Sequence, residues 1–152
     1  MRAFEVMIQP VVTVKEHDSV QEVVEKMIQH RLNHLPVVNE QNEILGCVSA
    51  ENLLKWIGRY HVYYDYYYFS GVYIDQEALE TKINRLAQQR VSELVNRKVV
   101  TVPMDEEVGE VATLLSKKST GYVMVESNGV LQGIISPDEL IRGLFHKERP
   151  YT

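Results

Sequence analysis

The first half of this 152-residue chain reappears in its second half, and this internal repeat restricts the possible folds more than any other feature. Residues from Val12 onward match residues from Val100 onward at a spacing of 88, which becomes 87 after a one-residue deletion. The second register pairs Gly46, Ser49 and Leu53 with Gly133, Ser136 and Leu140. Since identities recur in register, we expect two units of similar structure.

Each copy has the pattern of a strand, a helix, two strands and a second helix. The first copy has β-prone residues 11–14, a helix opened by a Ser19–Glu22 capping box, apolar runs at 35–38 and 44–48, and a helix from Ala50. The second copy repeats this order with β-prone residues 99–102, a helix from about Val108, strands at 122–125 and 131–135, and a helix from Pro137. Asn128-Gly129 predicts a tight hairpin between the last two strands.

The predicted fold class is α/β (α+β), with two pseudo-symmetric β-α-β-β-α motifs packed as one module. A half-sheet of one copy alone would expose an apolar face, so the two copies should cover each other. We place the first motif at residues 1–57, an inserted linker at 58–89, and the second motif with a C-terminal tail at 90–152.

The linker combines a tyrosine-rich stretch with a helical pattern. Residues 60–69 include seven aromatic side chains in ten positions. No basic cluster accompanies them, so base stacking is a remote interpretation. Tyrosines give large amphipathic contact areas, which favours packing or a homodimer interface. The spacing of Leu79, Ile83 and Leu86 predicts an amphipathic helix within residues 75–89.

Composition excludes several classes of protein. A net charge of −5 argues against non-specific binding to nucleic acid or anionic membranes. No apolar run approaches the roughly 18 residues of a membrane span. A single cysteine, Cys47, cannot form an internal disulfide, which predicts a reducing, cytoplasmic setting. The five histidines have no metal-ligand spacing, and no nucleotide-binding loop or hydrolase motif occurs, so we expect neither a metal site nor an enzyme.

Three segments resemble the cystathionine-β-synthase-type (CBS) domain family. They are residues 31–38 (RLNHLPVV), residues 46–53 (GCVSAENL) and residues 133–140 (GIISPDEL). The resemblance implies a pair of motifs about a pseudo-two-fold axis, with up to two clefts for AMP, ADP, ATP or S-adenosylmethionine. It also implies a flat homodimer and no tightly bound cofactor.

The resemblance further implies that a hydroxyl residue binds phosphate and that an acid three residues later binds ribose. The matching pairs here are Ser49 with Asn52 and Ser136 with Glu139, so neither copy has the family's Asp. An alternative stays open for both pairs. Asn52 can be a helix cap or solvated, and Ser136 with Glu139 can be a capping box with Pro137 at the first helical position.

The remaining cleft residues are also implied by the resemblance. The first cleft is expected to be walled by Val11, Val12, Leu35 and Pro36, and the second by Val99, Val100, Val123 and Met124. His34 and Tyr122 occupy equivalent positions facing the clefts. Candidate phosphate partners are Arg31, Lys55, Lys117, Lys118 and Arg142. The alternative is that these are ordinary core residues and solvated surface charges.

The sequence therefore predicts a regulatory module that senses an adenosyl ligand and signals to a separate, unidentified protein. The rival prediction is a dimerisation scaffold with degenerate, ligand-free clefts. A nucleic-acid binder built on the tyrosine-rich stretch is a remote third.

Overall fold

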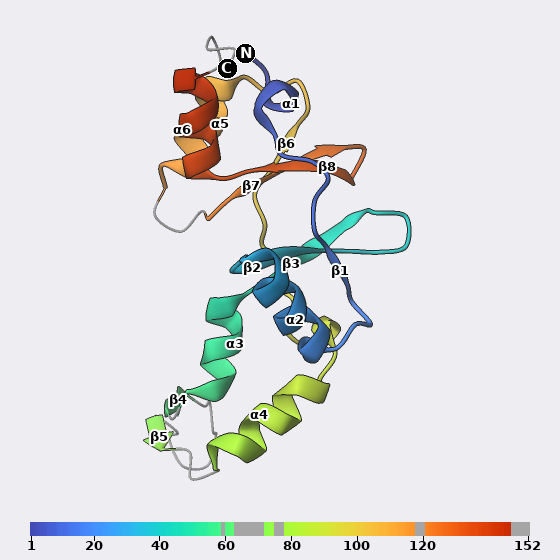
Figure 1. Cartoon of the computed structure of the whole chain (residues 1–152), viewed down its shortest axis with the longest axis vertical. Helices are drawn as coiled ribbons and strands as arrows, with labels where there is room; N and C mark the ends of the chain where they lie inside the picture. The colour runs from blue at the N-terminus through green and yellow to red at the C-terminus, as the bar shows by residue number, and fades with distance from the viewer. Residues whose placement is uncertain (59, 63–71, 75–77, 118–120, 147–152) are drawn as a thin grey trace.

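Two halves of similar construction are stacked end to end in the computed structural model, which describes residues 1–58, 60–62, 72–74, 78–117 and 121–146 (Figure 1). The first half contains β1 (Val14–Lys15), α2 (Val20–His30), β2 (His34–Val38), β3 (Ile44–Ser49) and α3 (Ala50–Ile57). The second contains β6 (Thr101–Pro103), α5 (Val108–Leu115), β7 (Val123–Ser127), β8 (Val130–Ile135) and α6 (Pro137–His146). The predicted order of elements is confirmed in both copies.

Each half has a three-stranded sheet with the same topology. The first strand is parallel to the second, and the second is antiparallel to the third, in both β1-β2-β3 and β6-β7-β8. The β7–β8 turn has positive φ at both central residues, 52° at Asn128 and 82° at Gly129, as the predicted tight hairpin requires. The longer β2–β3 loop uses Asn42, with φ 63°, for the same reversal.

The linker contributes a helix that covers the first half. Helix α4 (Leu79–Gln88) packs against α2 and α3, which confirms the predicted linker helix. Before it lie two short strands, β4 (Tyr60–Val62) and β5 (Val72–Ile74). Residues 63–69 of the tyrosine-rich stretch lie outside the described part of the chain, so its predicted interface role stays a prediction.

In each copy, the segment that precedes the first strand, here called the leading segment, packs on the other copy. Helix α1 (Ala3–Val6) lies beside α6 and β8 of the second half, and the short 3-10 helix η1 (Val91–Glu93) packs on the first half (Figure 1). Backbone hydrogen bonds fix both segments. Ile8 exchanges N–H···O bonds of 2.8 and 3.2 Å with Ile134, and Cys47 does so with Asn96 at 2.9 and 2.8 Å. Residues 1–8 thus pack with residues 97–146, and residues 91–96 with the first copy.

Glycine permits this close approach. A Cβ on Gly46 would lie 2.4 Å from the Asn96 carbonyl oxygen, and one on Gly133 would lie 2.6 Å from Met7 Sδ. These two glycines are equivalent in the repeat, so the same requirement acts in both halves. Their recurrence in the sequence therefore reflects backbone contact with a segment from elsewhere in the chain.

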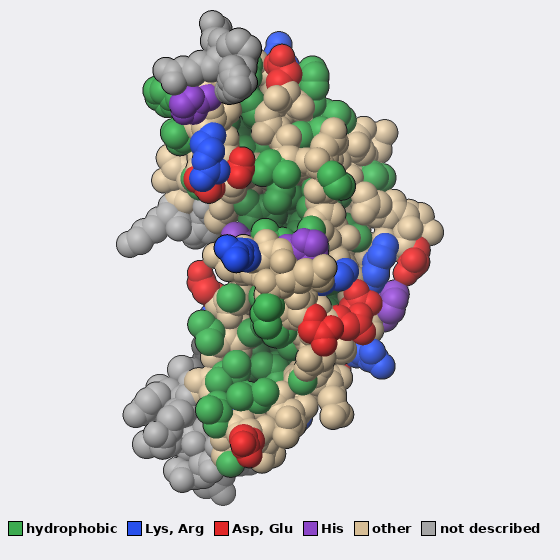
Figure 2. Space-filling model, in the orientation of Figure 1, with side chains coloured by type: hydrophobic (Ala, Val, Ile, Leu, Met, Phe, Trp, Pro, Cys, Tyr) green, Lys and Arg blue, Asp and Glu red, His purple; other side chains and the backbone are tan. Residues whose placement is uncertain are grey.

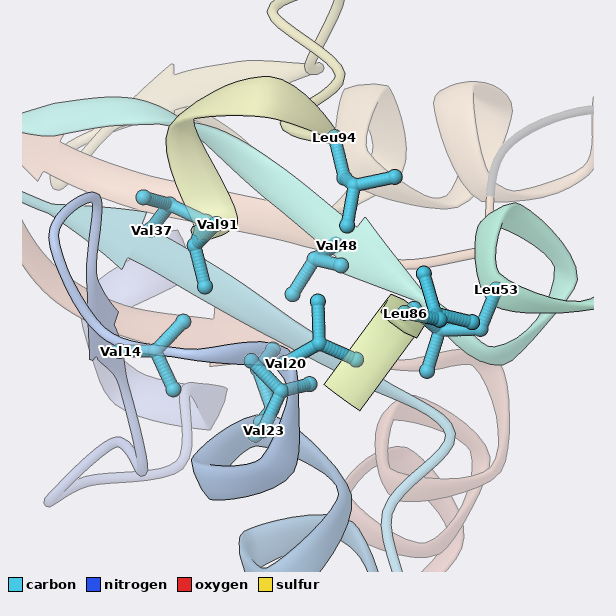
Figure 3. Packing of buried hydrophobic residues seen from close by; sticks show 10 residues of the cluster. Val14, Val20, Val23, Val37, Val48, Leu53, Leu86, Val91 and Leu94 are labelled. Atoms are coloured by element: carbon cyan, nitrogen blue, oxygen red, sulfur yellow. The ribbon is translucent and has the colours of Figure 1, made fainter. Parts of the chain in front are cut away.

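Three buried clusters hold the structure together. In the first half, β2 and β3 pack against α2, α3 and α4, with Val91 and Leu94 from the η1 segment closing the cluster (Figure 3). The second half has a matching cluster that includes Ala3 of α1. Val38, Met124 and Leu131 form the third cluster, between the halves. The apolar face that one copy would expose is thus covered by the other.

The predicted Ser19–Glu22 capping box forms only in part. Ser19 Oγ accepts a hydrogen bond of 3.2 Å from the Glu22 backbone N–H, as expected of a helix cap. The Glu22 carboxylate accepts from the Ser19 hydroxyl at 3.4 Å instead of reaching the Ser19 backbone. Residue Ser19 also forms a backbone bridge with Arg90, which ties the start of α2 to the linker.

Candidate functional site

A cavity of about 260 Å³ lies between the two halves. One wall is α3 of the first copy, and the facing wall is the segment that leads into β6 of the second copy. The floor comes from strands of both copies. The cavity is lined by His34, Cys47, Ser49, Glu51, Asn52, Lys55, Asn96, Lys98, Val99, Val100, Gly121, Tyr122 and Met124.

Helix α3 presents its N-terminal turn to the cavity. Strand β3 ends at Ser49, which caps the helix: its Oγ accepts from the Asn52 backbone N–H at 3.1 Å. Asn52 Oδ1 accepts from the Ser49 N–H at 3.1 Å and from the Ser49 hydroxyl at 2.9 Å. Asn52 is therefore a helix cap in this structure, the alternative left open for it. The positive end of the helix dipole favours an anion at this point.

The facing wall is fixed to the first copy by backbone hydrogen bonds. Asn96 pairs with Cys47, and its Oδ1 accepts from the Lys98 backbone N–H at 3.0 Å. This local turn places Lys98 on the cavity, followed by Val99 and Val100. The wall thus changes from charged to apolar along consecutive residues.

Two rings from equivalent positions meet at the floor. The His34 and Tyr122 ring centroids lie 4.4 Å apart with an angle of 87° between the planes. Burial lowers the pKa of His34, and the nearby Glu51 carboxylate acts in the opposite direction. Burial also raises the pKa of the Cys47 thiol and, strongly, that of the Tyr122 hydroxyl. All three groups are therefore uncharged near neutral pH.

Seven of the fourteen predicted ligand-binding residues line this cavity: His34, Ser49, Asn52, Val99, Val100, Tyr122 and Met124. They do not group as expected. Ser49 and Asn52 of the first copy face Val99 and Val100 of the second, where we expected Val11 and Val12. The exchange of leading segments explains this, because each copy's first strand is preceded by residues that pack on the other half.

Five of the predicted wall residues have other locations. Leu35 and Val123 are 0% exposed and belong to the cores of their own halves. Val12 packs against the first core and Val11 against the cluster between the halves. Successive strand residues face opposite sides, so His34 and Tyr122 leave no place at the cavity for Leu35 and Val123. Pro36 is buried and does not line the cavity.

The second Ser–acid pair differs from the first. The Ser136 hydroxyl donates to Asp138 Oδ1 at 2.9 Å, and Glu139 Oε1 accepts from Arg142 at 3.1 Å. The proposed Ser136–Glu139 capping box is therefore replaced by these two contacts. Glu139 and Arg142 line a shallower hollow of about 430 Å³ against α1, which also includes Glu5 and Met7.

Of the four predicted phosphate partners that the structure describes, one lines the cavity between the halves. That residue is Lys55. Arg142 is engaged by Asp138 and Glu139, and Arg31 is the left-handed residue that ends α2. Lys117 follows α5 and does not line the cavity, and Lys118 lies outside the described residues.

Sequence reasoning missed three polar residues of the cavity, namely Glu51, Asn96 and Lys98. One signal was available for the first, because Glu51 and Lys55 are four apart and share a helix face. Nothing in the sequence indicated Asn96 and Lys98, whose position depends on pairing between the linker and β3.

The sequence profile of the CBS domain matches residues 3–59 and 91–146, once for each copy. This chain belongs to the CBS-domain family. Among solved structures, CBSX2 in complex with AMP is similar with a TM-score of 0.73 and 19% identity, covering 97% of this chain and 98% of that one. The CBS domain pair of protein MJ0100, solved with 5′-methylthioadenosine and S-adenosyl-L-methionine, gives 0.66 and 20%, covering 97% and 98%.

Among the curated relatives, the L-aspartate semialdehyde sulfurtransferase of Methanocaldococcus jannaschii is 23% identical over 141 residues, which are 91% of this chain and 22% of that protein. This chain therefore spans about a fifth of the length of that relative.

The described residues contain neither a membrane-spanning helix nor a cluster of metal ligands. No helix there is long and apolar enough to cross a membrane. No group of three or more His, Cys, Asp or Glu side chains is arranged to hold a metal ion, again among the residues that the structure describes.

Proposed function

We propose that this CBS pair is a regulatory module that binds a phosphate-bearing adenine nucleotide in the cavity between its halves. The observation that carries the proposal is the mixed lining of the cavity. It combines apolar side chains, Val99, Val100 and Met124, with the start of α3 and two lysines, Lys55 and Lys98. An apolar base and an anionic group match these two kinds of lining.

The two lysines that line the cavity favour a phosphate over a cationic ligand. Lys55 lies on α3 and Lys98 on the facing segment, and neither ammonium group is paired with a described side chain. With His34 neutral, the cavity has these two positive charges, the helix dipole and one carboxylate, Glu51. AMP, ADP and ATP gain from this field, whereas the sulfonium of S-adenosylmethionine is repelled by it.

The volume of the cavity is compatible with such a ligand. Small-molecule pockets are typically about 300–1,000 Å³, so a cavity of about 260 Å³ lies just below this range and suits a small ligand of nucleotide size. The CBS neighbours cited above were solved with AMP or with methylthioadenosine and S-adenosylmethionine, which supports an adenosyl ligand here.

A ligand in this position would connect the two halves. It would contact α3 of the first copy and residues 96–100, which lead into the second. Binding then favours one relative arrangement of the halves, and a separate partner protein can read that arrangement. We place this activity in a reducing cytoplasm and in a homodimer, for which sedimentation equilibrium should give twice 17.6 kDa.

Thermal unfolding with a panel of ligands tests the proposal. Ligand at about 100 times its Kd stabilises by roughly 2.7 kcal/mol, which for this size raises Tm by about 5–11 °C. AMP, ADP or ATP should do so, S-adenosylmethionine less, and GMP least. No shift with any adenosyl ligand at millimolar concentration would favour the ligand-free scaffold.

Lysine variants refine the test. Lys55→Met and Lys98→Met should each weaken AMP binding by about 1–2 kcal/mol and leave adenosine binding nearly unchanged, because only AMP offers the charged partner. Lys117→Met, at an exposed residue that does not line the cavity, is the matched control. Equal losses for AMP and adenosine would show that the lysines do not contact phosphate.

A further inference from the structure

The acid expected by the family pattern is replaced by Asn52, and the structure uses that side chain for another purpose. Asn52 Oδ1 already accepts two hydrogen bonds, from the Ser49 N–H and the Ser49 hydroxyl. Turning this oxygen toward a ligand would remove both bonds and leave the Ser49 N–H without its cap. Asn52 is therefore poorly suited to accept from a ribose.

A different carboxylate is available one residue earlier. Glu51 lies in the first turn of α3, and its side chain lines the same cavity as Ser49 and Asn52. Within the described part of the chain, Glu51 makes no hydrogen bond or ion pair, and its one charge interaction is with His34. Among the residues that the structure describes, Glu51 is also the only carboxylate that lines this cavity.

Its location suits a sugar better than a phosphate. Glu51 lies on α3 one turn before Lys55, on the face of the helix that both share. A carboxylate has two oxygens, each able to accept from one of two adjacent hydroxyls. Next to a phosphate the same group would be repelled. A vicinal diol held by Glu51, with the phosphate held by the lysines, is consistent with these charges.

We propose that Glu51, rather than Asn52, is the acceptor for the ribose 2′- and 3′-hydroxyls in this cavity. The acid of the ribose contact has thus moved by one position along α3. This inference rests on the proposed function, since it requires an adenosyl ligand in the cavity. It assigns ligand specificity to a residue that the sequence pattern passes over.

Calorimetric titration with AMP, 2′-deoxy-AMP and 3′-deoxy-AMP tests the inference on the full chain. The wild-type protein should bind AMP about tenfold more tightly than either deoxynucleotide, because a hydrogen bond to a charged acceptor is lost in each. In Glu51→Gln, AMP affinity should fall by about tenfold, and the preference over both deoxynucleotides should shrink to within about threefold.

Two control variants separate this from other effects. Glu110→Gln removes an exposed first-turn acid from α5, remote from the cavity, and should leave all three affinities unchanged. Asn52→Asp keeps the acceptor for Ser49 and should not restore AMP affinity to Glu51→Gln. Near-equal melting temperatures of the variants would exclude unfolding as the cause.

The other possible results would contradict either the assignment of Glu51 alone or the proposed function as well. If the wild-type protein binds AMP but Glu51→Gln discriminates among the three nucleotides as before, the assignment of Glu51 is wrong and the proposed function stands. If Asn52→Asp alone tightens AMP, the ribose lies at Asn52. If neither AMP nor adenosine binds the wild-type protein, the proposed function falls together with this inference.

Discussion

His34 and Tyr122 occupy the same position in the two copies, and their rings touch each other, with centroids 4.4 Å apart and planes at 87°. Equivalent residues meet in this way only beside the axis that relates the copies. The two copies differ at this point, because one residue has a small polar imidazole ring and the other has a larger phenol ring. The two sides of the module can therefore have different ligand sites.

Replacing Tyr122 by Phe should leave stability unchanged or raise it by up to about 1–2 kcal/mol. The Tyr122 hydroxyl is buried, and among the described residues no group forms a hydrogen bond of good geometry with it. Its polar neighbour is the Cys47 thiol, a weak partner. Tyr122→Ala should instead cost about 3–5 kcal/mol, because it empties part of the cluster between the halves. Urea unfolding of both variants measures the difference, and a large loss in Tyr122→Phe would reveal a partner for the hydroxyl.

Stability should decrease as the pH falls through the range of His34 titration. Burial lowers the pKa of His34 in the folded state below its unfolded value of about 6.5. Below that pH the unfolded chain binds more protons, so the free energy of unfolding falls. His34→Gln should flatten the profile between about pH 7.5 and 5.5. A steeper slope in His34→Gln would contradict the sign.

Gly46→Ala should destabilise the protein by about 1–3 kcal/mol. The new Cβ would lie 2.4 Å from the Asn96 carbonyl oxygen, so the linker segment must move away from β3. Gly109→Ala is the matched control, because its Cβ meets nothing within 4 Å and it lies in α5. That control should be neutral or stabilising by up to about 1 kcal/mol. Chemical denaturation distinguishes the two, and equal effects would exclude close contact as the reason for Gly46.

Lys82→Met should cost about 1–3 kcal/mol, because a charged donor at the end of α3 is lost. Lys82 is 3% exposed, and its Nζ donates to the carbonyl oxygens of Ile57 at 3.1 Å and Gly58 at 2.8 Å. The methionine keeps most of the volume but leaves these oxygens unsatisfied. Lys117→Met, at an exposed site, should change the unfolding free energy by less than about 0.5 kcal/mol. A neutral Lys82→Met would show that water replaces the ammonium group.

The repeat and the local patterns predicted the elements of both copies, because periodicity and turn residues act within a few positions. They also placed Leu35 and Val123 on strands, and the resemblance to the CBS family assigned both residues to the clefts together with their neighbours. The alternation of side chains along β2 and β7 shows why only one of each adjacent pair can face the cavity. Lys98 and Asn96 could not be found in this way, because a backbone bridge to Cys47 positions them. The first turn of α3 was recognised, but whether Asn52 or Glu51 faces a ligand depends on side-chain hydrogen bonds that no spacing encodes.

Because each leading segment packs on the other copy, the core of the first half is continuous in the sequence and the core of the second half is not. Every residue of the first core, from Val14 to Leu94, lies in one continuous stretch, so this half can fold before the rest of the chain leaves the ribosome. The second half is discontinuous, since its core combines Ala3 with residues from Val102 to Leu140. Its completion requires the chain to close a loop of nearly its full length, which costs entropy and delays the step. A peptide of residues 9–96 should therefore form its own core with the face around Val38 left exposed, whereas residues 97–152 should require residues 1–8 supplied as a separate peptide.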